Sequence, residues 1–210
     1  MCCLIVHSVF FYLCIYVKKQ YLCKGSCKKH MTMYTIRKAE ITDLPQLEQI
    51  YAVAREKMRA AGNPNQWGNN YPSTELMTKD IQLGCNYLVL DNGDIVGTFV
   101  MFTAPDPSYK QIDGAWLNNE PYATIHRLAS LDGYHGIFAA VLDYVSSRYD
   151  NVRADTHQDN LRMQHLLLKH GFRYCGNILL SGRLPKELQP IQEDIQSDNP
   201  LFRLAYQLSK

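Results

Sequence analysis

Hydrophobic residues recur at two spacings between residues 34 and 210, and these spacings predict alternating strands and helices. Short stretches alternate between apolar and polar residues, as half-buried strands do. Longer stretches repeat apolar residues every three or four positions, as helices packed on a sheet do. Strands are expected over residues 34–39, 86–90, 95–102, 122–130, 151–156, 172–180 and 201–208. Helices are expected over residues 44–61, 74–83, 137–149 and 160–170.

Capping and turn residues support these boundaries. Thr42-Asp43 and Ser73 are expected to cap the first two helices, and Asp91-Asn92-Gly93-Asp94 is a strong signal for a hairpin turn. The expected order is β-α-α-β-β-β-α-β-α-β-β. Two long antiparallel strands that lead into a strand–loop–helix unit indicate an α/β (α+β) fold, in which helices cover both faces of a mixed central sheet.

Charge and cysteine are distributed unevenly along the chain. The chain has 22 Lys and Arg and 20 Asp and Glu, but residues 1–31 contain five of the lysines and no acid, so the remainder has 17 basic and 20 acidic residues. That net charge of −3, without a basic stripe, argues against a nucleic-acid-binding protein. The remainder contains two cysteines, Cys85 and Cys175, which do not make a disulfide scaffold. A reducing, cytoplasmic location is therefore expected.

The first residues are interpreted as an apolar and basic extension, 1–32, outside a domain that comprises 33–210. Residues 2–17 are apolar but shorter than the ~20 residues that cross a bilayer. A translated upstream stretch, with the functional start at Met31 or Met33, is the preferred interpretation; a short membrane anchor and a signal peptide are the alternatives. A zinc site would need more ligands than the pair Cys23-x-x-x-Cys27 supplies, so no metal is expected.

The segment Tyr122–Leu142 is the strongest candidate for a binding site. A strand there runs into a loop with Gly133 and Gly136 and then into a helix. Backbone N–H groups at a helix N-terminus are unpaired and carry partial positive charge, so such a turn can bind a pyrophosphate. A tight strand–helix turn without a ligand explains the two glycines equally well.

Together with the residues that follow, this segment resembles the GNAT superfamily of acyl-CoA N-acetyltransferases. IHRLAS followed by G-x-x-G is similar to the cofactor-binding strand–loop–helix of that superfamily, and DTHQDNLRMQHLLLKHGFRYCG is similar to its N…GF-x-x-x-G ending. The resemblance covers about Met33–Leu208, and NQWGNNYP, DPSY and RLAYQL are features of a little-characterised bacterial branch. It implies direct acetyl transfer from acetyl-CoA to an amine without a metal, and a mostly antiparallel sheet in which two neighbouring strands splay apart.

The resemblance also implies which residues bind the cofactor. The backbone of the strand before the loop would pair with the pantetheine arm, the loop amides would bind the pyrophosphate, and the start of the penultimate helix would reach toward the sulfur. These residues are Leu128, Ala129, Ser130, Gly133, Tyr134, His135, Gly136, Ile137, Phe138 and Asn160.

Two positions depart from the family pattern. Phe138 stands where the loop usually ends in a small residue, and its ring would crowd the cofactor. Leu167 stands where many members have a tyrosine that protonates the departing thiolate. A thiol with a pKa of ~8.5 has less need of such an acid. The departures prompt an alternative function, a non-catalytic acyl-CoA-binding or regulatory module with the same fold.

Acetyl transfer needs a proton acceptor, because an alkylammonium has a pKa of ~10 and attacks only after it loses a proton. His126, on the strand beside the acyl group, is the first candidate for this base. His157, with Asp155 two residues earlier on the same strand face, is the second, and Tyr174 is a candidate proton donor. Structural hydrogen bonding of the histidines and a core position for Tyr174 are the alternatives. A covalent route through Cys175 is less favoured, because a strand cysteine is usually a small buried hydrophobe.

Aromatic residues in polar loops are candidates for contact with the acceptor, although lids packed on the sheet are an equal alternative. These residues are Trp67, Tyr71, Tyr109 and Trp116. Asp106, Asp113 and Glu120 would suit a cationic amine. The expected partner is a small-molecule or peptide amine, with no nucleic acid, and with membrane contact only if residues 2–17 are an anchor. A homodimer is compatible with the sequence.

Overall fold

One mixed β-sheet runs through the part of the chain that the structure, a computed structural model, describes: residues 34–180 and 199–210. In that part eight strands lie in the order β1-β2-β3-β5-β6-β8-β7-β4. The strands are β1 (Thr35–Lys38), β2 (Asn86–Asp91), β3 (Asp94–Phe102), β4 (Asp113–Gly114), β5 (Tyr122–Ser130), β6 (Asn151–Thr156), β7 (Arg173–Leu179) and β8 (Phe202–Ser209). The helices are α2 (Leu44–Ala60), α3 (Thr74–Gln82), α4 (Ile137–Ser146) and α5 (Leu161–Lys169), with short 3₁₀ turns η1 (Ile41–Asp43) and η2 (Pro107–Tyr109).

The expected extension, residues 1–32, and its boundary with the domain lie outside the described residues. No helix within the described ranges is long and apolar enough to cross a membrane.

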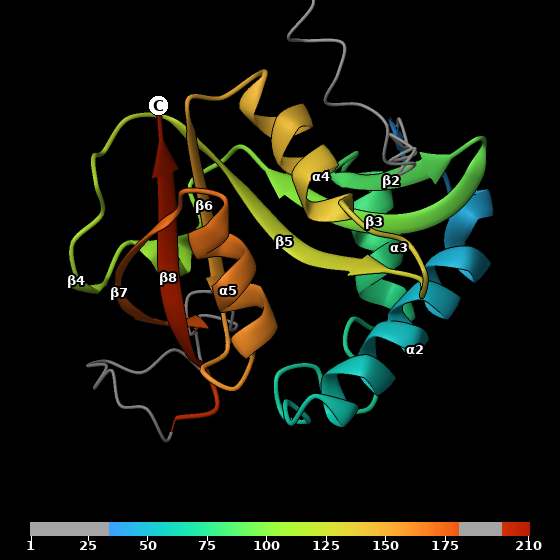
Figure 1. Ribbon diagram of the computed structural model, residues 1–210, viewed down its shortest axis with the longest axis horizontal. Helices are drawn as coiled ribbons and strands as arrows, with labels where there is room; N and C mark the ends of the chain where they lie inside the picture. Colours follow the sequence, from blue (N-terminus) through green and yellow to red (C-terminus); the bar gives the residue numbers. More distant parts are fainter. Residues whose placement is uncertain (1–33, 181–198) are drawn as a thin grey trace, which may run out of the picture. The chain divides into compact units, whose positions relative to one another are not determined.

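The sheet is antiparallel except where β5 and β6 meet. These two strands pair in parallel only from Tyr122↔Asn151 to Thr124↔Arg153, and beyond Thr124 they diverge (Figure 1). The expected fold class, a mostly antiparallel sheet with a splayed strand pair, is confirmed.

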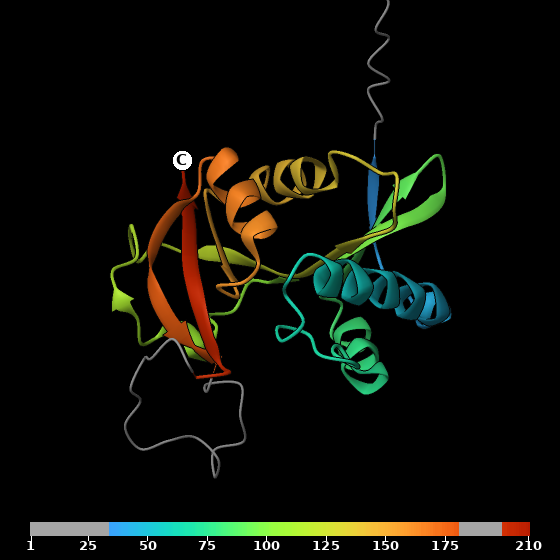
Figure 2. The same ribbon diagram turned by 60° about the horizontal axis from the view of Figure 1, so that its bottom comes forward.

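Helices cover both faces of the sheet, as expected. α2 and α3 lie on one face and α4 and α5 on the other (Figure 2). Because successive strand residues point to opposite faces, Leu88 packs in the cluster beneath α2, whereas Val89 packs in the larger cluster beneath α4. Leu167 of α5 is fully buried in that larger cluster.

A β-bulge interrupts β5 shortly after the strands separate. Val100 pairs with His126 and Thr98 pairs with Ala129, so two residues of β5, Arg127 and Leu128, lie opposite one residue of β3. Arg127 has φ +51°, a left-handed conformation that costs a non-glycine residue about 1–2 kcal/mol. Other interactions must therefore hold this residue in place.

The side chain of Arg127 supplies those interactions on the α2–α3 face. Its Nη2 lies 2.8 Å from Asp80 Oδ2 of α3, and its Nη1 donates to the Tyr71 hydroxyl at 3.1 Å. Tyr51 of α2 donates to the carbonyl of Arg127 at 3.1 Å. Burial raises the pKa of the Asp80 carboxyl, whereas in spite of burial Tyr71 and Asp80 raise the pKa of the Arg127 guanidinium. Loss of either partner would leave the other charge buried and unpaired, so the pair fixes the geometry of the bulge.

The two expected helix caps differ in the hydrogen bonds that their side chains make. Ser73 caps α3 as expected, and its hydroxyl accepts from the Leu76 N–H at 3.3 Å. Asp43 precedes α2, but its carboxylate accepts from Arg37 and from the Glu40 N–H instead of from the helix. Asp43 is thus the N-cap residue of α2, as expected, but its side chain makes no capping hydrogen bond to the helix, because its carboxylate is bound by Arg37.

The short edge strand β4 was not expected from the pattern. Its Gly114 pairs with Gly176 of β7, and a Cβ at Gly176 would lie 2.1 Å from the Asp113 carbonyl oxygen. The last glycine of the GF-x-x-x-G sequence is thus required by a close approach of two backbones.

We predict that Asp80→Ala lowers the free energy of unfolding by about 3–5 kcal/mol, because it leaves the Arg127 guanidinium buried without its carboxylate. Urea unfolding followed by circular dichroism measures the change. Asp132→Ala is the matched control: it also removes a carboxylate 2.8 Å from a cation, Lys57, but the Asp132 side chain is 82% exposed. That change should cost less than about 1 kcal/mol. Equal effects of the two substitutions would contradict the role given to the Arg127–Asp80 pair.

Candidate active site

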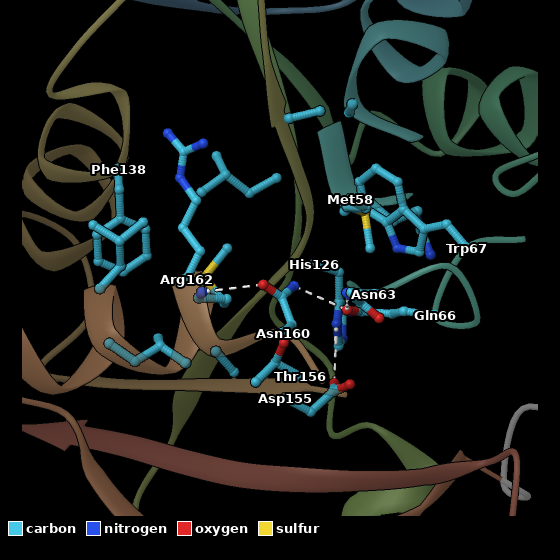
Figure 3. Close-up of a pocket in the computed structure, with 18 of the residues that line it drawn as sticks. Met58, Asn63, Gln66, Trp67, His126, Phe138, Asp155, Thr156, Asn160 and Arg162 are labelled. Carbon is cyan, nitrogen blue, oxygen red and sulfur yellow. Dashed lines mark hydrogen bonds and ion pairs between the residues drawn. The ribbon is translucent and has the colours of Figure 1, made fainter. Parts of the chain in front are cut away.

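A cavity of about 810 Å³ opens where β5 and β6 separate. Its walls come from α2 and the loop after it, from β5 beyond Thr124, from the start of α4, from the end of β6 and from α5. Figure 3 shows Phe138 on one side of this cavity, Asn63, Gln66 and Trp67 on the other, and His126 and Asn160 between them. The strand pair that the resemblance implies to be splayed therefore creates the site.

The start of α4 forms one wall and is open to an anion. Gly136 is the N-cap residue, with φ +80°, and no side chain caps the helix. A Cβ at Gly136 would meet no atom within 4 Å, so there is open space beside this residue, which also lines the cavity. Unpaired N–H groups and the helix dipole favour negative charge at this place.

The residues expected to bind the cofactor are brought together. All except Gly133 line the cavity: Leu128, Ala129, Ser130, Tyr134, His135, Gly136, Ile137, Phe138 and Asn160. Cationic residues of α2 and α5 line it as well: Lys57, Arg162 and Lys169. The cavity therefore offers positive charge and backbone donors to a phosphorylated ligand.

Phe138 does not occupy the space in front of the α4 N-terminus, although the sequence suggests that it would crowd the cofactor. Its ring is 5% exposed and packs edge-on against His170, with centroids 5.0 Å apart, and against Phe172. The large side chain is thus accommodated by the core, and the backbone N–H groups keep their orientation.

The backbone of β5 forms a second wall. Between Ile125 and Ser130 the edge of β5 that faces β6 has no strand partner in the described part of the chain. The bulge also places two residues opposite one of β3, so the ladder is interrupted at Arg127 and Leu128. The N–H groups of this edge are the donors available to a ligand in the cavity.

His126 lies between two buried carboxylates at the point where the strands diverge. Its Nε2 is 3.3 Å from Asp106 Oδ2, and its Nδ1 is 3.4 Å from Asp155 Oδ2. The three side chains are about 5–6% exposed. A neutral imidazole donates through one nitrogen only, whereas an imidazolium donates through both. The doubly protonated ring complements both carboxylates, and the three groups then carry one net negative charge.

The sequence suggests Asp155 as a neighbour of His157, but in the structure it lies beside His126. Its Oδ2 lies 3.4 Å from His126 Nδ1, because the last parallel pair, Thr124 with Arg153, stands two residues before His126 and Asp155 in their strands. Tyr109, expected at the substrate, instead donates to Asp155 Oδ2 at 2.7 Å. The alignment of neighbouring strands therefore decides the partner of Asp155, and the two-residue spacing within its own strand does not.

Several other expected site residues lie away from the cavity lining. Tyr109 and Trp116 pack in a separate cluster, where the Trp116 ring lies 4.0 Å from the Arg153 guanidinium. Tyr174 is 51% exposed and donates to Asn177 Oδ1 at 2.6 Å. Of the expected acceptor contacts, Trp67 and Tyr71 do line the cavity.

His157 also lies outside the lining, and its ring has a local partner. The Asp159 N–H donates to its Nδ1 at 3.2 Å. Burial and the nearby Arg203 lower the pKa of this imidazole, so the neutral ring that accepts this hydrogen bond is favoured.

Polar residues of the α2–α3 loop were not singled out by the sequence but line the cavity. Gln66 Oε1 accepts from Asn63 Nδ2 at 2.8 Å and from Asn160 Nδ2 at 2.9 Å. Asn160 Oδ1 in turn accepts from the Met163 N–H and caps α5. Asn160, which the resemblance places near the cofactor sulfur, thus links α5 to the α2–α3 loop (Figure 3).

Other features of the described residues bear on chemistry. Within residues 34–180 and 199–210 no group of three His, Cys, Asp or Glu side chains could hold a metal ion. Cys175, the candidate for a covalent route, is buried and does not line the cavity; burial raises the pKa of its thiol. Leu167 has no exposed surface and no acidic proton, so it cannot replace the family's tyrosine.

Comparison with known proteins identifies the fold and its relatives. No protein-family model and no curated protein matches the chain. Among solved structures, an acetyltransferase of the GNAT family from Streptococcus agalactiae 2603 is 26% identical, with a TM-score of 0.69, over 84% of this chain and 95% of that one. An acetyltransferase from Staphylococcus aureus MU50 is 25% identical, with a TM-score of 0.56, over 83% and 98% of the two chains.

A more distant structure shares the fold. Naa50 of Arabidopsis thaliana, in complex with a bisubstrate analogue, CoA-Ac-MVNAL, is 16% identical, with a TM-score of 0.50, over 84% of this chain and 99% of that one. The splayed sheet, the cavity it opens and these similarities agree with the motifs in residues 122–176. The chain belongs to the GNAT superfamily of acetyltransferases.

Proposed function

We propose that the protein is an N-acetyltransferase that moves an acetyl group from acetyl-CoA directly to a primary amine of a small molecule or peptide. The observation that carries this proposal is the cavity itself. Its lining, around about 810 Å³, joins an uncapped helix N-terminus, a strand edge without a partner in the described residues, and His126 and Asp155 of the buried carboxylate–imidazole–carboxylate unit. The first two features suit a phosphorylated thioester, and the third suits a reaction that releases a proton.

The residues present fit acetyl-CoA. The N–H groups that follow Gly136, with Arg162 and Lys169 of α5, would hold its phosphates. The backbone of Leu128, Ala129 and Ser130 would pair with the amide groups of its pantetheine arm, as one strand pairs with another. Acetyl-CoA supplies an activated acyl group whose leaving group is a thiolate.

The transfer forms one bond and breaks one. The amine nitrogen bonds to the acyl carbon, the carbon–sulfur bond breaks, and the sulfur keeps the electron pair. The acyl oxygen gains negative charge during the attack, and N–H groups of β5 at the bulge, with Leu128 as the first candidate, are suited to stabilise it. The proton that leaves the amine must go to the protein or to water.

The Asp106–His126–Asp155 unit is the proposed acceptor of that proton. With the ring doubly protonated, the unit carries one net negative charge. This charge attracts an ammonium group, and the unit can then take up one proton from it. Groups this close titrate together, so the proton belongs to the unit and not to one residue. Tyr109, which donates to Asp155, positions the carboxylate.

The alternative function, a module that binds acyl-CoA without transferring the acyl group, is prompted by one observation. Leu167 replaces the expected acid and is fully buried. A panel of amines separates the two functions: acetyl-CoA binding without amine-dependent thiol release from any of them would favour the module. The proposed setting is the cytoplasm, with Cys85 and Cys175 as free thiols.

We predict that Gly136→Asp weakens CoA binding at least tenfold, measured by isothermal titration calorimetry. The new carboxylate would stand in front of the α4 N–H groups and repel the pyrophosphate. Gly133→Asp is the matched control, because Gly133 has nearly the same φ, +82°, and open space around it but does not line the cavity. CoA affinity that falls equally in both variants would indicate loop strain instead of a phosphate site.

We also predict that His126→Asn lowers kcat more than tenfold while the affinity for acetyl-CoA stays within about twofold. Asparagine cannot carry the proton that links the two carboxylates, and His126 does not belong to the proposed phosphate-binding wall. Thiol release with an acceptor amine and calorimetry with acetyl-CoA give the two numbers. His157→Asn, the same change in a buried histidine outside the lining, should leave kcat within about threefold. Unchanged turnover in His126→Asn would remove the unit from the mechanism.

A further inference from the structure

Two buried polar atoms on the acceptor side of the cavity have no hydrogen-bond partner among the described residues. They are Oδ1 of Asn63, in the loop after α2, and Oγ1 of Thr156, the last residue of β6. Asn63 is 2% exposed, Thr156 is fully buried, and both line the cavity. Figure 3 shows both on the same side as His126, away from Phe138. Because an unpaired buried polar atom is costly, two of them beside one cavity point to a ligand.

The orientation of the Asn63 amide is fixed by its neighbours. Its Nδ2 donates to Gln66 Oε1 at 2.8 Å, and its backbone N–H donates to the Met58 carbonyl at 2.9 Å. Turning the amide over would place Oδ1 against Gln66 Oε1, which is itself an acceptor and already takes the Asn160 Nδ2. Oδ1 is therefore held as a free acceptor.

The chemistry of this subsite selects donors. An amide oxygen only accepts hydrogen bonds, and a threonine hydroxyl can accept or donate. The nearby lining groups Asp155 and Asp159 are carboxylates. A ligand that satisfies Asn63 must bring an N–H or O–H group, and a cationic N–H donor suits the carboxylates as well.

We propose that Asn63, assisted by Thr156, determines the specificity of the acetyl transfer, and that the acceptor is a primary amine carrying a second N–H or O–H donor close to the reacting nitrogen. This inference rests on the proposed function and names the class of acceptor. A simple alkylamine would leave Asn63 Oδ1 unpaired in the complex. Sites that hydrogen-bond a substrate group reject analogues that lack it much more strongly than apolar pockets reject a change of size.

The test compares acceptors in matched pairs with the full-length wild-type chain. Diamines, amino alcohols and amino amides with two to five carbons between the groups are each compared with the n-alkylamine of the same length, using thiol release from acetyl-CoA. At the preferred spacing we expect kcat/KM to be at least tenfold higher for the amine with the second donor. The diamines test a charged donor, and the alcohols and amides test neutral ones.

Variants then assign the preference to the two atoms. Asn63→Leu and Thr156→Val should each reduce the kcat/KM ratio of the matched pair at least threefold. Because both acceptors are measured on one preparation, a partly unfolded variant does not change the ratio. Thr124→Val is the control: Thr124 is also a fully buried threonine with an unpaired hydroxyl, but it lies outside the cavity lining, so the ratio should stay as in the wild type.

The outcomes separate this inference from the function on which it rests. If no amine of the panel causes thiol release, the proposed acetyl transfer fails. If alkylamines and their donor-bearing partners react equally well, or if the ratio survives in both Asn63→Leu and Thr156→Val, transfer stands and the specificity role is overturned. A second readout is the thermal unfolding midpoint of the free protein. It should not fall in Thr156→Val, because that change removes an unpaired polar atom from the interior.

Discussion

The left-handed conformation of Arg127 and the groups that hold it are the constraint on which the site depends. The residue lies in β5 just after the last pair with β6, and its side chain reaches through the α2–α3 face to Asp80 and Tyr71. The bulge lies between the pairs that His126 and Ala129 make with β3, so it includes Leu128 and follows His126 directly. The backbone donors at the bulge therefore depend on a local distortion that costs energy and is maintained by burial.

The cavity is divided chemically. One wall presents backbone N–H groups and basic side chains of α5, such as Arg162, and the opposite side presents oxygen atoms of Asn63, Gln66 and Asp155. This arrangement separates a place suited to phosphates from a place suited to an amine. His126 lies between them, where an acyl group and an amine would meet (Figure 3). The net charge of the whole chain, +2, does not reveal this division. The division involves only the few residues that form each wall.

The regular elements could be predicted from the sequence because their signals are local. β5 and β6 have the expected limits, and α5 begins one residue after the expected first residue, Asn160, which caps it. β4 is two residues long and has no periodicity, so only its pairing with β7 reveals it. The site was harder to predict, because the contacts between its functional side chains join segments that are distant in the sequence. His126 was predicted on its strand, yet its partners follow from the register with β6 and from the path of the connector that contains Asp106. Polar loop residues such as Asn63 look the same in a sequence whether they face solvent or line a cavity.

The uncapped N-terminus of α4 has a consequence for how the sequence of such a protein can diverge. A binding wall made of backbone N–H groups is indifferent to most side chains that surround it, as the burial of Phe138 in the core demonstrates. At the N-terminus of α4, selection then acts on the backbone conformation, which depends on a residue such as Gly136 that has a positive φ. The side chains at neighbouring positions are free to change. Structures only about a quarter identical to this chain have a similar fold, as expected where backbone conformation matters more than most side chains.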